Sequence, residues 1–193
     1  MSNTESIHKR FLEIETKYDA DFINRLTFKA LMKGMSPKSF LYVESSDRYF
    51  VKSETEFLRF RMPPDNDQRA ELTFKKKHGT LNNNVRTEVN LRVDNNSADT
   101  VNAFCEGLGY KFNFSIYKMC DIYYFEDANV VLYSVIDEDN KIKTFLEIEV
   151  REDQDILEEA AWDIVLKYEK ILNPLGINGQ KRKRLSLFEM YKK

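Results

Sequence analysis

The amino-acid sequence predicts an α+β protein in which a closed antiparallel β-barrel, or tunnel, has a polar, charged interior and helices packed outside. Five segments alternate charged and apolar residues with a period of two, which is the pattern of β-strands with two unlike faces. One long segment near the C-terminus instead has apolar residues at helical spacing. The 193 residues, 42% of them hydrophobic and 32% charged, suit one domain of barrel size over residues 1–193.

The first strand is expected at residues 11–17, Phe-Leu-Glu-Ile-Glu-Thr-Lys. Residues two apart share a strand face, so Glu13, Glu15 and Lys17 project together while the apolar side chains point the other way. A single strand of this kind is ordinarily a surface strand with solvated charges. The recurrence of the pattern along the chain favours a charged interior.

The remaining elements follow in order. Asp21 is expected to cap a helix that runs to about Lys33 and ends at Gly34, and Ser97 is expected to cap a second helix. We expect strands at 40–44, 47–52, 56–62, 69–77, 86–92, 111–125, 129–136 and 145–151, the helix that Ser97 caps at 98–107, and a third helix at 153–172.

Four later strands sort their charges onto one face in the same way. Surface ion pairs contribute only about 0–1 kcal/mol each, so stability gives little reason for this sorting. If these faces turn inward, the barrel encloses a polar tunnel. The side chains in the tunnel would be Glu13, Glu15, Glu88, Glu147 and Glu149, together with Lys17, Arg59, Arg61, Lys75, Lys77 and Arg86.

This mixture of charges is typical of a site for a metal-bound polyphosphate. Hard divalent cations such as Mg²⁺ take carboxylate oxygens and share phosphate oxygens with a substrate. Arginine and lysine neutralise the remaining phosphate charge. Neither set suffices alone, because clustered carboxylates repel a polyanion and cations alone bind phosphate without activating it.

The order of these motifs resembles the CYTH, or triphosphate tunnel metalloenzyme, superfamily. The resembling features are the Glu-x-Glu-x-Lys opening, the paired arginines, the Thr-x-Lys strand and the late Glu-x-Glu. In addition, residues 47–50, Asp-Arg-Tyr-Phe, look like the family's Asp-x-Tyr-Phe strand. Lys118 stands where its Lys-x-Arg strand begins, and Arg184 resembles the basic residue that opens its last conserved segment. Members include class IV adenylyl cyclases, thiamine triphosphatases, inorganic triphosphatases and RNA triphosphatases.

The resemblance implies roles for individual residues. It implies that four glutamates hold Mg²⁺ or Mn²⁺ and that a set of cations holds a triphosphate. We assign metal binding to Glu13, Glu15, Glu147 and Glu149, and add Glu88 from the face pattern. We assign catalysis to Glu13, Glu15, Lys17, Glu147 and Glu149, and substrate binding to Lys17, Arg59, Arg61, Lys75, Lys77, Arg86, Lys118 and Arg184.

Three positions depart from the family pattern. Cys120 stands where the family has an arginine, Asn90 where a glutamate is common, and Tyr133 where an aspartate usually binds metal. A phenol is a poor Mg²⁺ ligand compared with a carboxylate. Either Asp137 or Glu138 supplies the missing carboxylate, or a second ion is weakly held, or hydrolysis has been lost while binding persists.

The function expected from these residues is that of a metal-dependent triphosphatase, which hydrolyses a nucleoside triphosphate or another organic or inorganic triphosphate inside the tunnel. Two alternatives stay open. One is a class IV-type adenylyl cyclase that makes cyclic AMP from ATP. The other is a non-catalytic tunnel that binds a nucleotide or polyphosphate.

The composition indicates where in the cell the protein is expected and which classes of partner it is expected to bind. A net charge of −2 and a pI near 5.8 argue against extensive nucleic-acid binding, since phosphate-backbone contact requires a basic excess. The two cysteines are not spaced like the ligands of a metal site, and we expect them to be reduced thiols. With no apolar run of membrane-spanning length and no signal peptide, a cytoplasmic protein without a membrane partner is expected. Uncovered apolar strand faces would be compatible with a homodimer.

Overall fold

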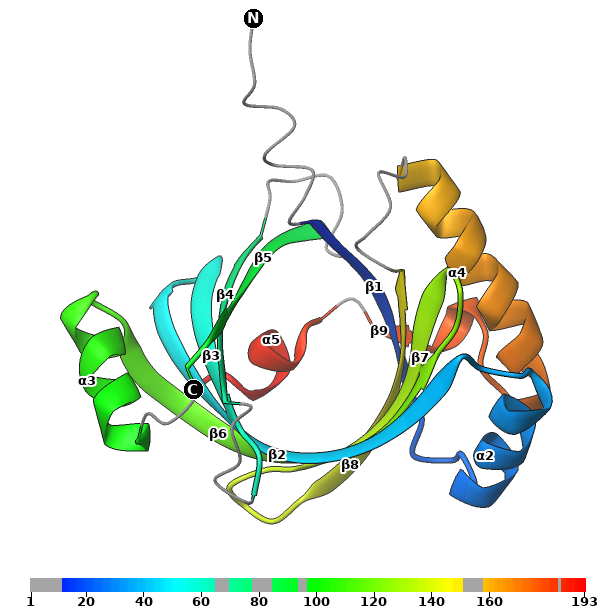
Figure 1. Cartoon of the computed structure of the whole chain (residues 1–193), viewed down its shortest axis with the longest axis horizontal. Helices are drawn as coiled ribbons and strands as arrows, with labels where there is room; N and C mark the ends of the chain where they lie inside the picture. Colours follow the sequence, from blue (N-terminus) through cyan, green and yellow to red (C-terminus); the bar gives the residue numbers. More distant parts are fainter. Residues whose placement is uncertain (1–11, 65–69, 78–84, 94–96, 151–157, 184) are drawn as a thin grey trace, which may run out of the picture.

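A computed structural model describes residues 12–64, 70–77, 85–93, 97–150, 158–183 and 185–193. The side chains of residues 12–14, 77, 85, 86 and 158 also lie outside the described part. The strands form a ring with helices around it (Figure 1). They are β1 (Leu12–Asp19), β2 (Ser39–Ser53), β3 (Glu56–Met62), β4 (Glu71–Lys77), β5 (Val85–Arg92), β6 (Lys111–Tyr124), β7 (Ala128–Ile136), β8 (Ile142–Val150) and β9 (Arg182–Lys183). The helices are α2 (Arg25–Gly34), α3 (Ala98–Gly107), α4 (Glu158–Leu172) and α5 (Leu187–Tyr191), with short 3₁₀ turns η1 (Asn173–Leu175) and η2 (Gly179–Lys181).

All nine strands belong to one antiparallel sheet, in the order β5-β4-β3-β2-β6-β7-β8-β1-β9. One edge of β1 pairs with β8 along most of its length. Its other edge is divided, since Leu12–Ile14 pair with β5 and residues 17 and 18 pair with β9. The two ends of the sheet order therefore meet at β1. The α+β class and the antiparallel sheet agree with the prediction.

Most predicted elements are present, with local differences. The strands expected at 40–44 and 47–52 form one strand, β2, because Ser45 and Ser46 stay paired with β6. The first helix is capped by Asn24 and not by Asp21, whose carboxylate accepts a hydrogen bond from the Thr144 amide at 2.6 Å. Helix α3 has the expected bounds and Ser97 as its N-cap.

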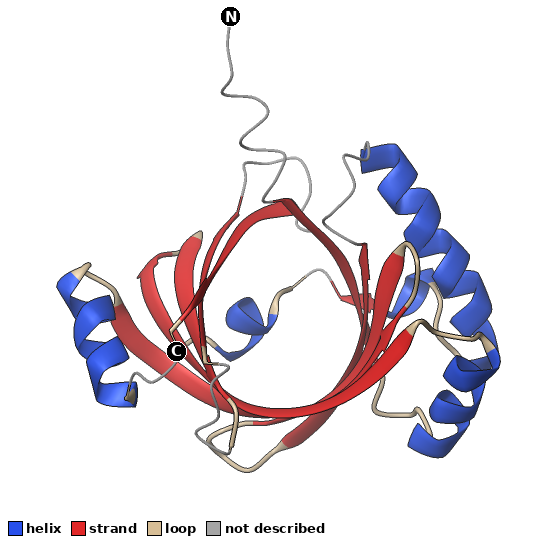
Figure 2. Ribbon diagram, viewed as in Figure 1, coloured by secondary structure: helices blue, strands red, loops and turns tan. Residues whose placement is uncertain are grey.

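Three helices cover the outside of the ring (Figure 2). Helices α2 and α4 bury Phe28 and Val165 against the outward residues of β7 and β8, such as Leu146 and Ile148. On the opposite side, α3 packs Val101 and other residues against the outward face of β2, β3 and β4. Apolar side chains therefore point outward under helices, which leaves the other strand face for the interior. None of the helices in the described residues combines the length and the apolar character that a membrane crossing requires.

Helix α5 lies within the ring and fills one end of its interior (Figure 1). Phe188 stacks on Phe57 with ring centroids 4.4 Å apart, and Tyr49 stacks on Phe114 at 4.4 Å. A capping box between Ser186 and Glu189 starts the helix. The interior thus has an aromatic floor at this end. The sequence analysis did not anticipate this helix.

Candidate functional site

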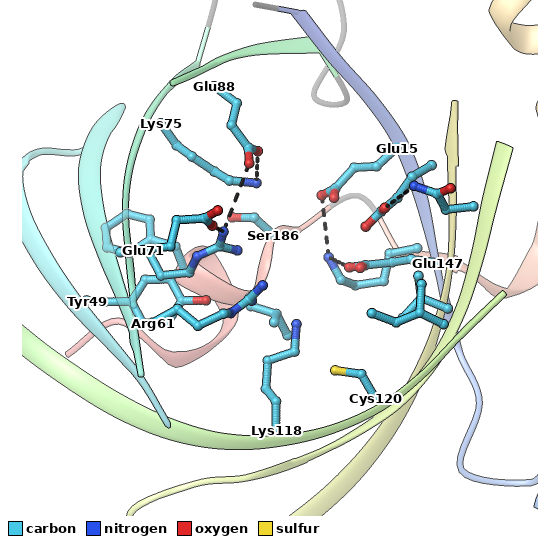
Figure 3. Close-up of a pocket in the computed structure, with 18 of the residues that line it drawn as sticks. Glu15, Tyr49, Arg61, Glu71, Lys75, Glu88, Lys118, Cys120, Glu147 and Ser186 are labelled. Carbon is cyan, nitrogen blue, oxygen red and sulfur yellow. Dashed lines mark hydrogen bonds and ion pairs between the residues drawn. The ribbon is translucent and has the colours of Figure 1, made fainter. Parts of the chain in front are cut away.

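A cavity of about 220 Å³ lies inside the ring, above the aromatic floor (Figure 3). We call it the charged cavity because ionisable side chains form most of its wall. Its acidic lining residues are Glu15, Glu71, Glu88, Glu147 and Glu149, and its basic ones are Lys17, Arg59, Arg61, Lys75 and Lys118. Every predicted site residue whose side chain is described lines this cavity. The side chains of Glu13, Lys77 and Arg86, and all of Arg184, lie outside the described residues, although the backbones of Glu13 and Arg86 pair between β1 and β5.

Three carboxylates form an acidic wall. The register of β1 with β8 sets Glu15 opposite Glu149, and Glu147 follows on the same face of β8. Carboxylate oxygens of Glu15, Glu147 and Glu149 lie within 4.8 Å of one another. Burial, together with the charges of Glu147 and Glu15, raises the pKa of Glu149 to about 7. Burial and the neighbouring carboxylates therefore oppose ionisation of Glu149.

One oxygen of Glu147 is held by two donors. The Lys17 ammonium lies 2.7 Å from Glu147 Oε1 and 3.7 Å from a Glu15 oxygen. The Tyr133 hydroxyl donates to the same Glu147 oxygen at 2.7 Å. Burial and the Glu147 charge hold the pKa of Tyr133 well above its usual range, so the phenol acts as a donor. Lys17 and Tyr133 together fix the position of this carboxylate.

The acidic wall fits a divalent cation. Its three converging groups are all carboxylates, the hard oxygen ligands that Mg²⁺ and Mn²⁺ prefer. The Lys17 ammonium forms ion pairs with two of the three carboxylates, those of Glu15 and Glu147. A buried cluster of like charges is costly, and a metal ion would offset the repulsion among the carboxylates.

Cations form the opposite wall, where several are held in place by acids (Figure 3). Arg61 makes a bidentate pair with the fully buried Asp47, with both N···O distances 2.8 Å. Although burial alone would raise it, the pKa of Asp47 lies well below its usual range because of Arg61. Arg59 donates to the Thr73 hydroxyl at 3.0 Å, and Lys75 lies 2.5 Å from Glu88. The pairs hold these cations in fixed geometry.

Lys118 differs from the other cations. It is 6% exposed, and its ammonium lies 4.1 Å from the centroid of the Tyr133 ring. Among the described residues no carboxylate lies within ion-pair distance of this ammonium. A buried, unpaired cation that faces a cavity is a strong indication of an anionic ligand.

Comparisons with known proteins agree with this geometry. No family model matches the sequence, and no curated protein matches it. Among solved structures, a conserved hypothetical protein from Pyrococcus furiosus has a TM-score of 0.72 and 24% identity over 92% of this chain and 98% of its own. A proposed adenylate cyclase from Vibrio parahaemolyticus has a TM-score of 0.67 and 16% identity, over 93% and 97% of the two chains. The RNA triphosphatase domain of the mimivirus mRNA capping enzyme has a TM-score of 0.56 and 12% identity, over 90% and 99%.

The chain shares its fold with these proteins, which is consistent with its resemblance to the CYTH, or triphosphate tunnel, superfamily. Within this fold the described carboxylates of the cavity separate into two groups. Glu88 lies on the basic wall beside Lys75 and is not part of the three-carboxylate cluster. The neighbouring Asn90 is exposed and donates to Glu88 at 3.1 Å.

The nearby acids do not supply the carboxylate that the resemblance implies at position 133. Asp137 accepts two backbone hydrogen bonds in the turn between β7 and β8, from residues 139 and 141. Glu138 accepts from the Ser115 amide at 2.9 Å and pairs with Lys193. Neither belongs to the three-carboxylate cluster. Cys120 does line the charged cavity, where burial raises the pKa of its thiol.

The sequence analysis missed three contributors to this site. Asp47 was noted in a motif but was given no partner, although it shares an inward strand face with Tyr49 and meets Arg61 by register. Asn129, which donates to Glu149 at 3.4 Å, carries no charge and gave no signal. Phe188 was missed with its helix, although the Ser-x-x-Glu capping box at residues 186–189 was a readable signal.

Proposed function

We propose that this chain is a metal-dependent triphosphatase, which hydrolyses the terminal phosphoanhydride bond of a triphosphate inside a closed tunnel formed by a single domain over residues 1–193. One observation carries the proposal: three clustered carboxylates face buried cations across a cavity of about 220 Å³. The pairing of β1 with β5 supports a closed tunnel. The fold shared with an RNA triphosphatase domain supports the reaction class.

The basic wall binds the phosphate chain in this proposal. Acidic partners already orient Arg61 and Lys75, and the Thr73 hydroxyl and Glu71 orient Arg59, so little ordering is required when a phosphate arrives. Lys118 lacks such a partner and meets the phosphate directly. Charge that develops on the transferred phosphoryl group is stabilised by these fixed donors, which is the main protein contribution in phosphoryl transfer.

The acidic wall holds the metal in this proposal. Glu15, Glu147 and Glu149 would bind a divalent ion, with Glu147 kept in place by Lys17 and Tyr133. A bound ion neutralises phosphate charge and lowers the pKa of a bound water. Water attacks the terminal phosphorus, the bridging P–O bond breaks, and orthophosphate and the shortened chain leave.

A substrate panel tests the proposal. Purified protein is mixed with ATP, GTP, thiamine triphosphate and tripolyphosphate, first with Mg²⁺ and then with Mn²⁺, and orthophosphate is measured. We expect release from at least one substrate and its loss in EDTA. Lys118→Met should lower kcat/KM by roughly a hundredfold or more, the effect of removing a charge-assisted contact in a dry site. Lys118→Arg should retain part of the activity.

The matched control lies on the same strand. Lys111 also belongs to β6 but is exposed, so Lys111→Met should leave kcat/KM unchanged. Absence of orthophosphate from every substrate with both metals would refute the triphosphatase.

The same panel distinguishes a cyclase. The solved structures include a proposed adenylate cyclase with a higher TM-score than the triphosphatase domain, 0.67 against 0.56. A cyclase would convert ATP into cyclic AMP and pyrophosphate, whereas a triphosphatase yields ADP and orthophosphate. Separation of the nucleotide products by chromatography therefore decides between the two reactions, and ligand binding with no product would identify a non-catalytic tunnel.

A further inference from the structure

One half of β2 has an edge that no other described strand occupies. From Ser46 onward β2 lies between β6 and β3, whereas residues 39–45, the blue half of β2 in Figure 1, pair with β6 alone among the described strands. The sequence after β3 explains the difference. Met62 ends β3 opposite Ser46, and Pro63 and Pro64 follow, which have no amide hydrogen to extend the pairing. We call the unpaired side of residues 39–45 the open edge.

The chain after β3 leaves space beside the open edge. Residues 41–45 and the two prolines line a common cavity of about 730 Å³. A strand edge that faces space presents main-chain donors and acceptors without strand partners, and such groups favour pairing with another chain.

The open edge is also apolar. Phe40, Leu41 and Tyr42 are 47%, 38% and 45% exposed, and in the described part of the chain no other three consecutive residues are all large, apolar and exposed. Proteins usually protect an edge of this kind with lysine, proline or a bulge. Residues 39–45 contain no lysine or proline, and their pairing with β6 has no register shift. The open edge therefore lacks the usual protection against association.

The sequence along the open edge is complementary to itself. If a second copy pairs antiparallel with Leu41 opposite Leu41, then Lys38 lies opposite Glu44 and Phe40 lies opposite Tyr42. Two-fold symmetry makes each of these pairs occur twice. Opposite charges and aromatic rings that face each other across two strands both stabilise a sheet. No other register sets Lys38 opposite Glu44.

Both charged residues are accessible to a second copy. Lys38 precedes β2, but its amide donates to the Tyr124 carbonyl at 2.8 Å, so the chain here still follows β6. Its ammonium pairs with Glu126 within the same chain, and both side chains are exposed. Glu44 accepts from the Tyr42 hydroxyl at 2.6 Å and from the Tyr117 hydroxyl. A carboxylate has further acceptor sites, so Glu44 can also accept from a lysine.

We propose that the chain forms a homodimer in which the open edges of two copies pair antiparallel about a two-fold axis, with Leu41 opposite its own copy. The pairing gives partners to the main-chain groups of the open edge. It also removes Phe40, Leu41 and Tyr42 of each copy from water. The sheets of the two rings then become continuous across the axis.

The mass of the assembly in solution tests the proposal. In sedimentation equilibrium at increasing protein concentration, we expect a particle with twice the mass of the 193-residue chain. Leu41→Glu places two carboxylates opposite each other at the axis and should raise the dissociation constant of the dimer by about tenfold or more. Ile142→Glu is the matched control, since Ile142 is an exposed apolar residue at the start of β8, and it should leave the dimer intact.

Charge reversal tests the register. Lys38→Glu sets two glutamates opposite each other in both pairs, and Glu44→Lys sets two lysines opposite each other, so each variant alone should dissociate. Mixed in equal amounts, the two variants should form a heterodimer, because the glutamates of one chain then face the lysines of the other. The double variant Lys38→Glu/Glu44→Lys should form a homodimer again. Thermal melts confirm that each variant is folded.

Amide hydrogen exchange locates the contact. Amides in residues 39–45 should exchange more slowly in the wild type than in Leu41→Glu, because the second copy protects those on the open edge. Amides of β2 from Ser46 onward already lie between two strands and should show no such difference.

A monomer at every concentration would overturn the proposal and leave the open edge to a strand of another protein. A dimer that survives Leu41→Glu would place the interface elsewhere and would also overturn it. Single charge variants that stay monomeric after mixing would overturn the pairing of Lys38 with Glu44. None of these outcomes affects the triphosphatase, which product release tests separately.

Discussion

At the residue scale, Glu149 shows how the site is arranged for a ligand and not for stability. It is packed among Glu15 and Glu147, and its nearest described donor is the Asn129 amide at 3.4 Å. Its pKa is raised to about 7, first by burial and then by the two neighbouring charges. Ionised Glu149 therefore costs free energy in the metal-free protein, and a bound cation removes that cost.

Glu149→Gln should stabilise the metal-free protein above neutral pH. The folded-state pKa of about 7 lies above the unfolded value of about 4.3, so the wild type gains stability as the pH falls through this window. Glutamine has no such titration. In EDTA at about pH 8, the variant should be more stable by on the order of 1–3 kcal/mol. The difference should become small near pH 3, where Glu149 is almost fully protonated in both states.

Urea unfolding across this pH range measures the effect. The change in the free energy of unfolding is obtained from the shift of the urea midpoint, provided that the m-value is unchanged. A variant that is less stable than the wild type at high pH, or a difference that does not change with pH, would contradict the arrangement of charges. Glu159→Gln, at an exposed position of α4, is the control and should show little pH-dependent change. The same Glu149→Gln protein should bind Mg²⁺ more weakly, because one carboxylate ligand has been lost.

At the scale of elements, helix α5 closes one end of the interior although it has only five residues. So short a helix is not stable alone, and its packing must hold it. Leu187 and Phe188 are 7% and 3% exposed, and Phe188 stacks on Phe57. The main-chain amide of Lys193 donates to the Asn113 side chain at 3.0 Å and further anchors the following residues.

Phe188→Ala should lower the free energy of unfolding by about 3–5 kcal/mol, the usual cost of removing a buried phenylalanine ring. Leu185→Ala is the matched control, because Leu185 precedes α5 but is 50% exposed, and its effect should stay within about 0.5 kcal/mol. Urea unfolding of both variants measures the difference. Equal effects of the two variants would show that α5 is not part of the core.

The strands were predictable because alternation marks the two faces of each strand. The three-carboxylate cluster was partly predictable for the same reason, since Glu15 and Glu147 recur in similar segments. Alternation does not give register, however. Glu88 belongs to the basic wall because β5 sets it opposite Lys75, and no local pattern encodes that pairing. Likewise Ser45 resembles a turn residue but continues β2 because β6 pairs with it.

The role of Tyr133 shows a second limit of prediction from the sequence. Compared with the motif of the family that the sequence resembles, position 133 has no carboxylate that could bind a metal. In the structure it lies opposite Cys120 on β6 and Phe145 on β8, which directs its hydroxyl to Glu147. This contact joins residues on neighbouring strands, so it depends on packing that the sequence around position 133 does not show.

At the scale of the whole molecule, the three clustered carboxylates and most of the cations lie on different sides of the charged cavity. The carboxylates of β1 and β8 lie on one side of the charged cavity, and the cations of β3, β4 and β6 lie across from them (Figure 3). A metal ion bound to the acids and a triphosphate bound to the cations would meet in the same small cavity. Each ligand then improves the site for the other, because the ion reduces the repulsion between the phosphates and the acidic wall.

Metal and triphosphate should therefore stabilise the protein together by more than the sum of their separate effects. Thermal melts are recorded with Mg²⁺ alone, with tripolyphosphate alone and with both. We expect a coupling of about 1–3 kcal/mol, which raises the melting temperature by several degrees beyond the sum. Glu15→Gln and Glu149→Gln should still respond to tripolyphosphate alone but lose the extra shift, since the acidic wall is incomplete. If these variants keep the full extra shift, Mg²⁺ acts only as a complex with free tripolyphosphate, and the acidic wall does not bind the ion.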